Sequence, residues 1–160
     1  DLAELARVTA ERLAPRAEAR EVKLRLAASP DAPPAWADRD RIAQVLVNLL
    51  DNAIKYSYTG GDVSIRVTSD GAAEMALVEI EDHGIGISAD DLLHIGRRFY
   101  RADKARTRAR RRADGQRDVQ SGSGLGLSIA VALVEAHGGD LRIESREGAG
   151  TTVSFTLPTI

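Results

Sequence analysis

Hydrophobic residues recur along this chain with two spacings, which predict helices in some segments and strands in others. In residues 2–20 the large aliphatic residues lie on one side of a helix, which Pro15 is expected to kink or split. Residues 22–26 alternate between apolar and polar side chains and predict a strand. The most strongly helical run is 38–56, and Asp38 is expected to cap its N-terminus, where a carboxylate accepts from free backbone N–H groups.

The remainder of the chain predicts more strands and two further helices. A short helix is expected over 88–95 and a longer one from 122 to about 137. Four alternating or β-branched segments predict strands, at 63–69, 75–82, 140–145 and 152–157. About five strands and three main helices predict an α/β (α+β) fold, a two-layer sandwich in which helices cover one face of a mixed five-stranded sheet. The length suits a single domain, 1–160.

Composition narrows the functional classes. Hydrophobic residues make up 43% and charged residues 29%, an ordinary globular balance, and the net charge of -2 gives no general attraction to nucleic acid or anionic lipid. The absence of cysteine excludes disulfides and thiolate metal sites. No apolar run is long enough to span a bilayer, so no direct membrane contact is expected. The chain begins with Asp1 inside a helical pattern, so we expect a fragment of a longer protein.

The helical run 38–56 contains an unusual polar stripe. Asn48, Asn52 and Lys55 fall on one stripe of the helix, beside an apolar stripe that should face the core. Carboxamide oxygens can bind a hard cation such as Mg²⁺, and a lysine supplies a positive charge for a phosphate. The stripe therefore fits a magnesium-nucleotide, although taken alone it fits a solvated polar face equally well.

The strand 75–82 ends in a second candidate segment. Asp82 precedes Gly84 and Gly86, which would let the backbone approach a flat ligand, and its carboxylate can accept a hydrogen bond from an amine such as that of adenine. An ordinary strand-to-helix turn is the alternative. Residues 84–89 also fit the dinucleotide pattern G-x-G-x-x-G/A, but the acidic residue that the pattern requires is replaced by an arginine-rich stretch around Arg106. We therefore set the dinucleotide interpretation aside.

Two glycine-rich segments follow. Residues 122–127 open the helix that ends near 137, where exposed backbone N–H groups and the helix dipole favour an anion. Residues 148–152 predict a tight turn before the last strand. Either segment is a weak signal by itself.

In this order, the four segments resemble the N, G1, G2 and G3 boxes of the GHKL (Bergerat-type) ATP-binding fold, which gyrase, heat-shock chaperones, mismatch-repair ATPases and sensor histidine kinases share. Residues 98–101, Arg-Phe-Tyr-Arg, resemble the F box of the histidine kinases, and residues 136–139 resemble the end of their last helix. The resemblance covers nearly the whole chain and is closest to the catalytic ATP-binding domain of a two-component sensor histidine kinase.

The resemblance implies ATP and Mg²⁺ as cofactors and assigns residues to them. Asn52 would be the main Mg²⁺ ligand, with Asn48 assisting directly or through water. Lys55 and Arg101 would contact the phosphates, and these four residues form the expected catalytic group. The other implied nucleotide-binding positions are Tyr56 and Ile87 beside the adenine, Asp82 at its amino group, Thr151 next to Asp82, and Gly84, Gly86, Gly122, Ser123, Gly124, Leu125, Gly126 and Leu127 along the glycine-rich loops.

The resemblance also implies which reaction occurs. Members that hydrolyse ATP have a glutamate at the position of Asn48, and an asparagine cannot take a proton from water. The expected acceptor is a histidine on a separate dimerisation and phosphoacceptor domain, with a response regulator as a further partner. His83, His94 and His137 do not lie in an acceptor-like helix, so we expect this chain to bind ATP without phosphorylating itself. Because the family dimerises through the separate domain, the resemblance also implies that this chain is a monomer.

Residues 101–121 are rich in arginine and poor in large apolar side chains, and the resemblance places the ATP lid there. A disordered loop is compatible with that role, whereas nucleic-acid binding is not expected because aromatic residues are not interleaved with the arginines. Other open alternatives are a GHKL serine kinase that regulates a sigma factor and a non-catalytic nucleotide-binding interaction module. The family implies a cytoplasmic domain whose parent protein is anchored in the membrane.

Overall fold

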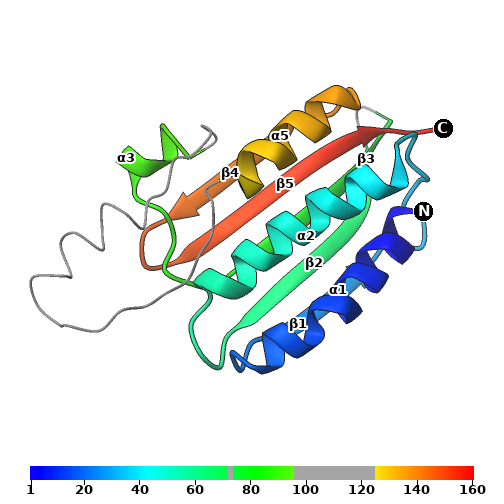
Figure 1. Ribbon diagram of the computed structural model, residues 1–160. Helices are drawn as coiled ribbons and strands as arrows, with labels where there is room; N and C mark the ends of the chain where they lie inside the picture. Colours follow the sequence, from blue (N-terminus) through cyan, green and yellow to red (C-terminus); the bar gives the residue numbers. More distant parts are fainter. Residues whose placement is uncertain (72–73, 96–124) are drawn as a thin grey trace, which may run out of the picture.

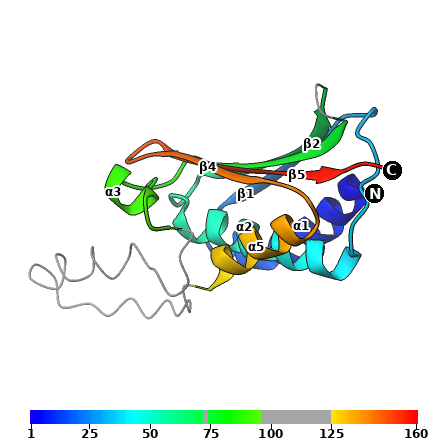
Figure 2. The same cartoon turned by 90° about the horizontal axis from the view of Figure 1, so that it is seen from above.

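The computed structural model describes residues 1–71, 74–95 and 125–160. Figures 1 and 2 show two layers, a twisted sheet and a layer of helices that covers one of its faces. The elements follow in the order α1 (Leu2–Glu18), β1 (Lys23–Ala28), α2 (Arg39–Tyr56), β2 (Asp62–Asp70), β3 (Met75–Asp82), α3 (Ala89–Leu92), α5 (Gly126–Ala136), β4 (Leu141–Arg146) and β5 (Gly150–Pro158). The predicted α/β sandwich with a five-stranded sheet is confirmed.

The sheet is mixed, with the strand order β1-β2-β3-β5-β4. β1 pairs with β2 in parallel, so the chain must cross back between them, and α2 makes that crossover. The other strand pairs are antiparallel. The register places Asp82, the last residue of β3, between Val63 of β2 and Thr151 of β5. The G1 and G3 segments, which are far apart in the sequence, therefore meet at one end of the central strands.

The core lies between the sheet and the helices. Every second residue of β3 and three alternate residues of β2 (Val63, Ile65 and Val67) are buried, and with the apolar stripe of α2 they form the core. The largest fully buried side chains are Phe155, Ile42, Leu46, Leu50, Ile54, Ile65, Ile80 and Leu157, with four valines. Each such side chain stabilises the fold by about 1.5–3 kcal/mol relative to exposure. Because α2 is anchored along this whole stripe, its neighbouring polar stripe has a fixed direction.

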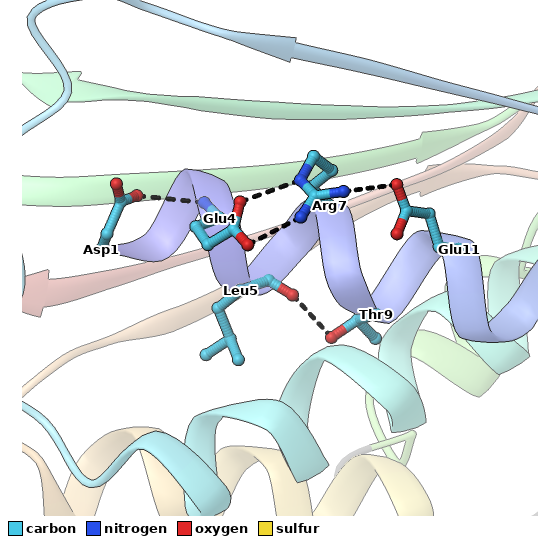
Figure 3. Close-up of polar contacts among 6 residues, drawn as sticks. All are labelled: Asp1, Glu4, Leu5, Arg7, Thr9 and Glu11. Carbon is cyan, nitrogen blue, oxygen red and sulfur yellow. Dashed lines mark hydrogen bonds and ion pairs between the residues drawn. The ribbon is translucent and has the colours of Figure 1, made fainter.

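α1 is continuous through Pro15, so the expectation of a split helix is wrong. Leu13 and Ala17, on either side of the proline, are both buried in the core, and this packing compensates for the hydrogen bond that proline cannot donate. The outer side of α1 is a ladder of polar contacts (Figure 3). Arg7 pairs with Glu4 at 2.7 Å and with Glu11 at 2.5 Å.

The helix starts follow the capping rules. The Asp38 carboxylate accepts from the backbone N–H groups of Asp40 at 2.9 Å and Arg41 at 3.1 Å, which confirms it as the N-cap of α2. These hydrogen bonds lower the pKa of Asp38. Ser88 caps the short helix α3 through Asp91, and α3 ends before the predicted boundary at 95.

Outside the named strands, Ala35 and Thr159 form a single antiparallel bridge. Within the described part of the chain, no helix combines the length and apolar character that crossing a membrane requires.

Candidate functional site

The polar stripe of α2 meets the first residue of α5. Asn48 and Asn52 are both half-buried on this stripe, and the Asn48 Nδ2 group donates to the carbonyl oxygen of Gly126 at 3.1 Å. The amide nitrogen of Asn48 is thus committed to the protein backbone, and its oxygen is the atom that remains for a cation or a donor. The structure therefore brings residues of the predicted N and G2 boxes into direct contact.

The last turn of α2 holds a positive charge. The Lys55 ammonium donates to the hydroxyl oxygen of Tyr56 at 3.1 Å and lies 4.7 Å from the centre of the Tyr56 ring. Such a cation over an aromatic face is held by the negative charge density of the ring. Tyr56 and Lys55 therefore form one unit at the end of the helix, half-buried and next to the loop that follows β3.

The loop after β3 lies directly against the end of α2. The Ile85 backbone N–H donates to the carbonyl oxygen of Tyr56 at 3.1 Å. A Cβ atom at position 84 would lie 2.0 Å from that same oxygen, so only glycine allows this approach. Gly86 has a φ of +64°, and a Cβ there would lie 2.0 Å from the carbonyl oxygen of Arg146. The two glycines are thus required by close backbone contacts on both sides of the loop.

Asp82 is a buried carboxylate at the start of this loop, and its residue is only 7% exposed. Burial raises its pKa, while hydrogen bonds from the backbone N–H groups of Gly84 and Thr151 oppose the rise. The Gly84 bond is 2.9 Å long. A carboxylate has about four acceptor positions, so these two donors leave capacity for a ligand N–H group.

Sequence reasoning missed Ser145, which joins the three segments around Asp82. Its hydroxyl donates to the carbonyl oxygen of Gly150 at 2.8 Å and accepts from the Ile87 N–H at 2.8 Å. The Thr151 hydroxyl lies 2.8 Å away, and it must be the donor because the one hydrogen of Ser145 is already used. The signal in the sequence is a serine on the inner side of β4, in phase with Leu141 and Ile143.

We expect Ser145→Ala to destabilise the domain by about 1–3 kcal/mol, because the Ile87 N–H and the Thr151 hydroxyl lose their common partner. Adenosine binding should weaken by about fivefold, since the loop beside Asp82 becomes less ordered. Denaturant unfolding and calorimetry measure the two effects. Ser154→Ala, on the opposite side of the sheet, is the matched control, and equal behaviour of the two variants would contradict this role for Ser145.

The raised pKa of Asp82 predicts a pH dependence of ligand binding. The ionised carboxylate accepts the stronger hydrogen bond, so adenosine affinity should fall as the pH decreases through a value above the ordinary 3.8. Stability should change in the opposite direction: the folded state binds this proton more tightly than the unfolded chain, so Asp82 reduces stability as the pH rises from its unfolded to its folded pKa. Asp82→Asn should remove the pH dependence of adenosine affinity over this range, as calorimetry at several pH values would show.

Several predicted site residues lie outside the described residues. They are Arg101, Gly122, Ser123 and Gly124, together with the predicted lid 101–121 and the F box 98–101. Leu125 and Leu127 are half-buried at the start of α5, and the Leu125 carbonyl oxygen accepts from the Ser128 hydroxyl at 2.9 Å.

Among the described residues, no group of three or more histidines and carboxylates could hold a metal ion. The amide oxygens of Asn48 and Asn52, together with oxygens of a ligand, are donors of the kind that a hard cation takes.

Comparison with known proteins matches this arrangement. Residues 37–160 match the family profile described as "Histidine kinase-, DNA gyrase B-, and HSP90-like ATPase". The chain belongs to this ATPase family. The sequence resembled the histidine-kinase branch of this family. The relatives described below are histidine kinases, which confirms that resemblance.

The sensor histidine kinase WalK of Bacillus subtilis (strain 168) is 46% identical over 121 residues, which are 76% of this chain and 18% of WalK. YclK, a sensor histidine kinase of the same organism, is 40% identical over 157 residues, 98% of this chain and 30% of YclK. The chain thus spans less than a third of either relative.

Solved structures agree. The mycobacterial sensor histidine kinase MprB superposes with a TM-score of 0.77 at 27% identity, over 99% of this chain and 95% of that one. Full-length ShkA in complex with AMPPNP gives 0.80 at 28% identity, over 99% of this chain and 30% of that one. These proteins confirm the expectation of a histidine-kinase-type ATP-binding domain.

Proposed function

We propose that this domain binds Mg²⁺-ATP and donates the γ-phosphate to a histidine on a separate dimerisation and phosphoacceptor domain of a sensor histidine kinase. The observation that supports this best is the contact between the end of α2 and the loop after β3. Through Tyr56 and Ile85 it joins the amide and ammonium groups of α2 to the buried Asp82 carboxylate. One end of the domain thereby offers a partner for a purine amine and partners for a metal-bound polyphosphate.

In this proposal the adenine lies near Asp82, with Tyr56, Ile87 and Thr151 around it. Mg²⁺ would be held by Asn52, with Asn48 assisting, and when bound it would neutralise charge on the phosphates. Lys55 and Arg101 would contact the phosphates, and the residues from Gly122 to Leu127 would present backbone N–H groups to them. A divalent ion with few protein ligands usually keeps its remaining positions for water and phosphate oxygens, which suits this amide set.

Transfer to a side chain fits the site better than hydrolysis. The Asn48 amide nitrogen donates to Gly126, and an amide oxygen cannot take a proton from water. The incoming histidine nitrogen would form the new bond to the γ-phosphorus while the bond from that phosphorus to the β–γ bridging oxygen breaks. ADP leaves, and the proton on the other nitrogen of the histidine ring passes to an acidic neighbour on the acceptor domain.

The histidines of this chain do not suit the acceptor role. His94 is half-buried just after the short helix α3. His137 Nδ1 lies 2.6 Å from the Leu133 carbonyl oxygen, and its Nε2 accepts from the Asp38 N–H at 3.2 Å. His83 is largely exposed and lies 3.7 Å from a Glu81 carboxylate oxygen, beside the adenine end rather than the phosphate end. We therefore propose that the isolated domain is monomeric and does not phosphorylate itself. A response regulator would receive the phosphate, and a membrane-anchored parent would keep this domain in the cytoplasm.

The test combines this chain with radiolabelled Mg²⁺-ATP and a separately purified dimerisation and phosphoacceptor domain from the parent protein. We expect acid-labile phosphate on the acceptor domain and none on this chain. Acid-stable phosphate on an acceptor serine would instead support the serine-kinase alternative. Binding of AMPPNP without any transfer would support a non-catalytic interaction module, and stoichiometric acid-labile phosphate on the isolated chain would contradict the acceptor assignment.

A further inference from the structure

The C-terminal end of α2 lacks the glycine that commonly closes a helix. Its C-cap is Ser57, in an extended conformation with φ -65° and ψ 150°. The last carbonyl groups of the helix therefore need donors from other parts of the chain. Ser57 satisfies one of them, because its N–H and its hydroxyl both donate to the Ala53 oxygen, at 3.0 Å and 2.8 Å.

Two further carbonyl groups of this turn are held from different elements. The Arg20 Nη1 group, just beyond α1, donates to the Lys55 oxygen at 2.9 Å. The Ile85 N–H, in the loop after β3, donates to the neighbouring Tyr56 oxygen at 3.1 Å. The turn that ends in Lys55 and Tyr56 is thus fixed between the end of α1 and the loop beside Asp82.

A second arginine of α1 acts one turn earlier. Arg16 Nη1 lies 2.5 Å from Asp51 Oδ1, an ion pair whose geometry falls outside that of a hydrogen bond. That oxygen is shielded from solvent, although the arginine is largely exposed. Arg16 lies in the last turn of α1, and Arg20 lies just beyond the end of that helix. Figures 1 and 2 show α1 and α2 side by side, with both helices ending at the same end of the sheet.

We propose that Arg20, assisted by Arg16, is a positioning residue for the phosphate-binding side of the site, an inference that rests on the proposed function. Arg20 does not touch the ligand; it holds the backbone of Lys55, and Arg16 holds the residue that precedes Asn52. A cation at the C-terminus of a helix is also favoured by the helix dipole. The end of α1 thereby sets the place of the ammonium and amide groups.

The test compares Arg20→Ala with Arg12→Ala, which removes the same charge from an exposed position of α1. Calorimetry measures the affinities for Mg²⁺-AMPPNP and for adenosine, which has no phosphates. Arg20→Ala should weaken Mg²⁺-AMPPNP binding about fivefold and adenosine binding less than about twofold. Arg12→Ala should leave both affinities within about twofold of wild type. Arg20→Lys, which keeps the charge and a donor, should recover part of the loss.

The outcomes separate this inference from the proposed function. If wild type and Arg20→Ala bind Mg²⁺-AMPPNP equally well, this inference is overturned and the proposed function is not. Equal losses for adenosine and Mg²⁺-AMPPNP also overturn it, because they indicate general loosening. If Arg20→Ala does not fold, Arg16→Ala and Arg20→Lys provide the same comparison, with a selective loss for Mg²⁺-AMPPNP expected in each. If wild type binds neither ligand, the proposed function and this inference are both overturned.

Discussion

Replacing Asp82 with alanine is expected to weaken the binding of an ATP analogue by about ten- to more than a hundredfold, since a hydrogen bond to a charged group contributes about 1.5–3 kcal/mol. The carboxylate is buried, and backbone N–H groups of Gly84 and Thr151 fix its orientation. Water therefore cannot replace it easily as an acceptor for the purine amine. Calorimetric titration with AMPPNP measures the effect.

Two variants make the interpretation of this result specific. Asp82→Asn keeps the side-chain volume and one acceptor oxygen, so it should fall between wild type and alanine. Asp62→Ala removes a carboxylate that pairs with Arg25 on the surface, at 3.3 Å, and should leave affinity unchanged. An Asp82→Ala variant that binds AMPPNP within about threefold of wild type would contradict the assignment of Asp82 to the purine amine.

Replacing Asn52 with alanine should remove the gain in affinity that Mg²⁺ gives to an ATP analogue. It should also lower the rate of phosphate transfer at least about a hundredfold, because a metal that neutralises phosphate charge contributes several kcal/mol. Asn52 lies one turn beyond Asn48 on the polar stripe of α2, and the Asn48 nitrogen already donates to Gly126. Titrations with and without Mg²⁺ measure the first effect, and transfer to the acceptor domain measures the second.

The matched control is Gln44→Ala, which removes an exposed amide from the same helix and should change neither quantity. Asn52→Asp keeps an oxygen ligand and adds charge, so it should retain a Mg²⁺-dependent gain. If Asn52→Ala keeps the gain and Asn48→Ala loses it, the main metal ligand is Asn48 and the assignment of Asn52 is wrong.

Much of the local structure followed from the sequence because its causes are local. The helix 39–56 was predictable from its apolar stripe and from Asp38, whose carboxylate needs only the next two or three N–H groups. The alternation in β3 likewise predicted a strand that ends near Asp82. These signals depend on the nearest few residues, and tertiary packing reinforces them.

The assembly of the site required more than local signals. β5 inserts between β3 and β4, and only that pairing puts Thr151 beside Asp82. No spacing in the sequence states that order, and the family resemblance suggested only that Thr151 lies next to Asp82. Ser145 and Arg20 were missed because a hydroxyl and a guanidinium are common on surfaces, and their partners lie elsewhere in the fold. The predicted split at Pro15 was wrong for a related reason, because the burial of its neighbours outweighs the tendency of proline to interrupt a helix.

The hydrogen bond from Asn48 to Gly126 bears on how transferases and hydrolases of this fold are related in evolution. A glutamate at position 48 would offer the base that water activation needs, but a carboxylate has no N–H group to give the Gly126 carbonyl oxygen. The exchange would set two acceptors against each other and remove this hydrogen bond between α2 and α5. A lineage that passes from one chemistry to the other would therefore lose this link between the two helices at the same step that gains the base.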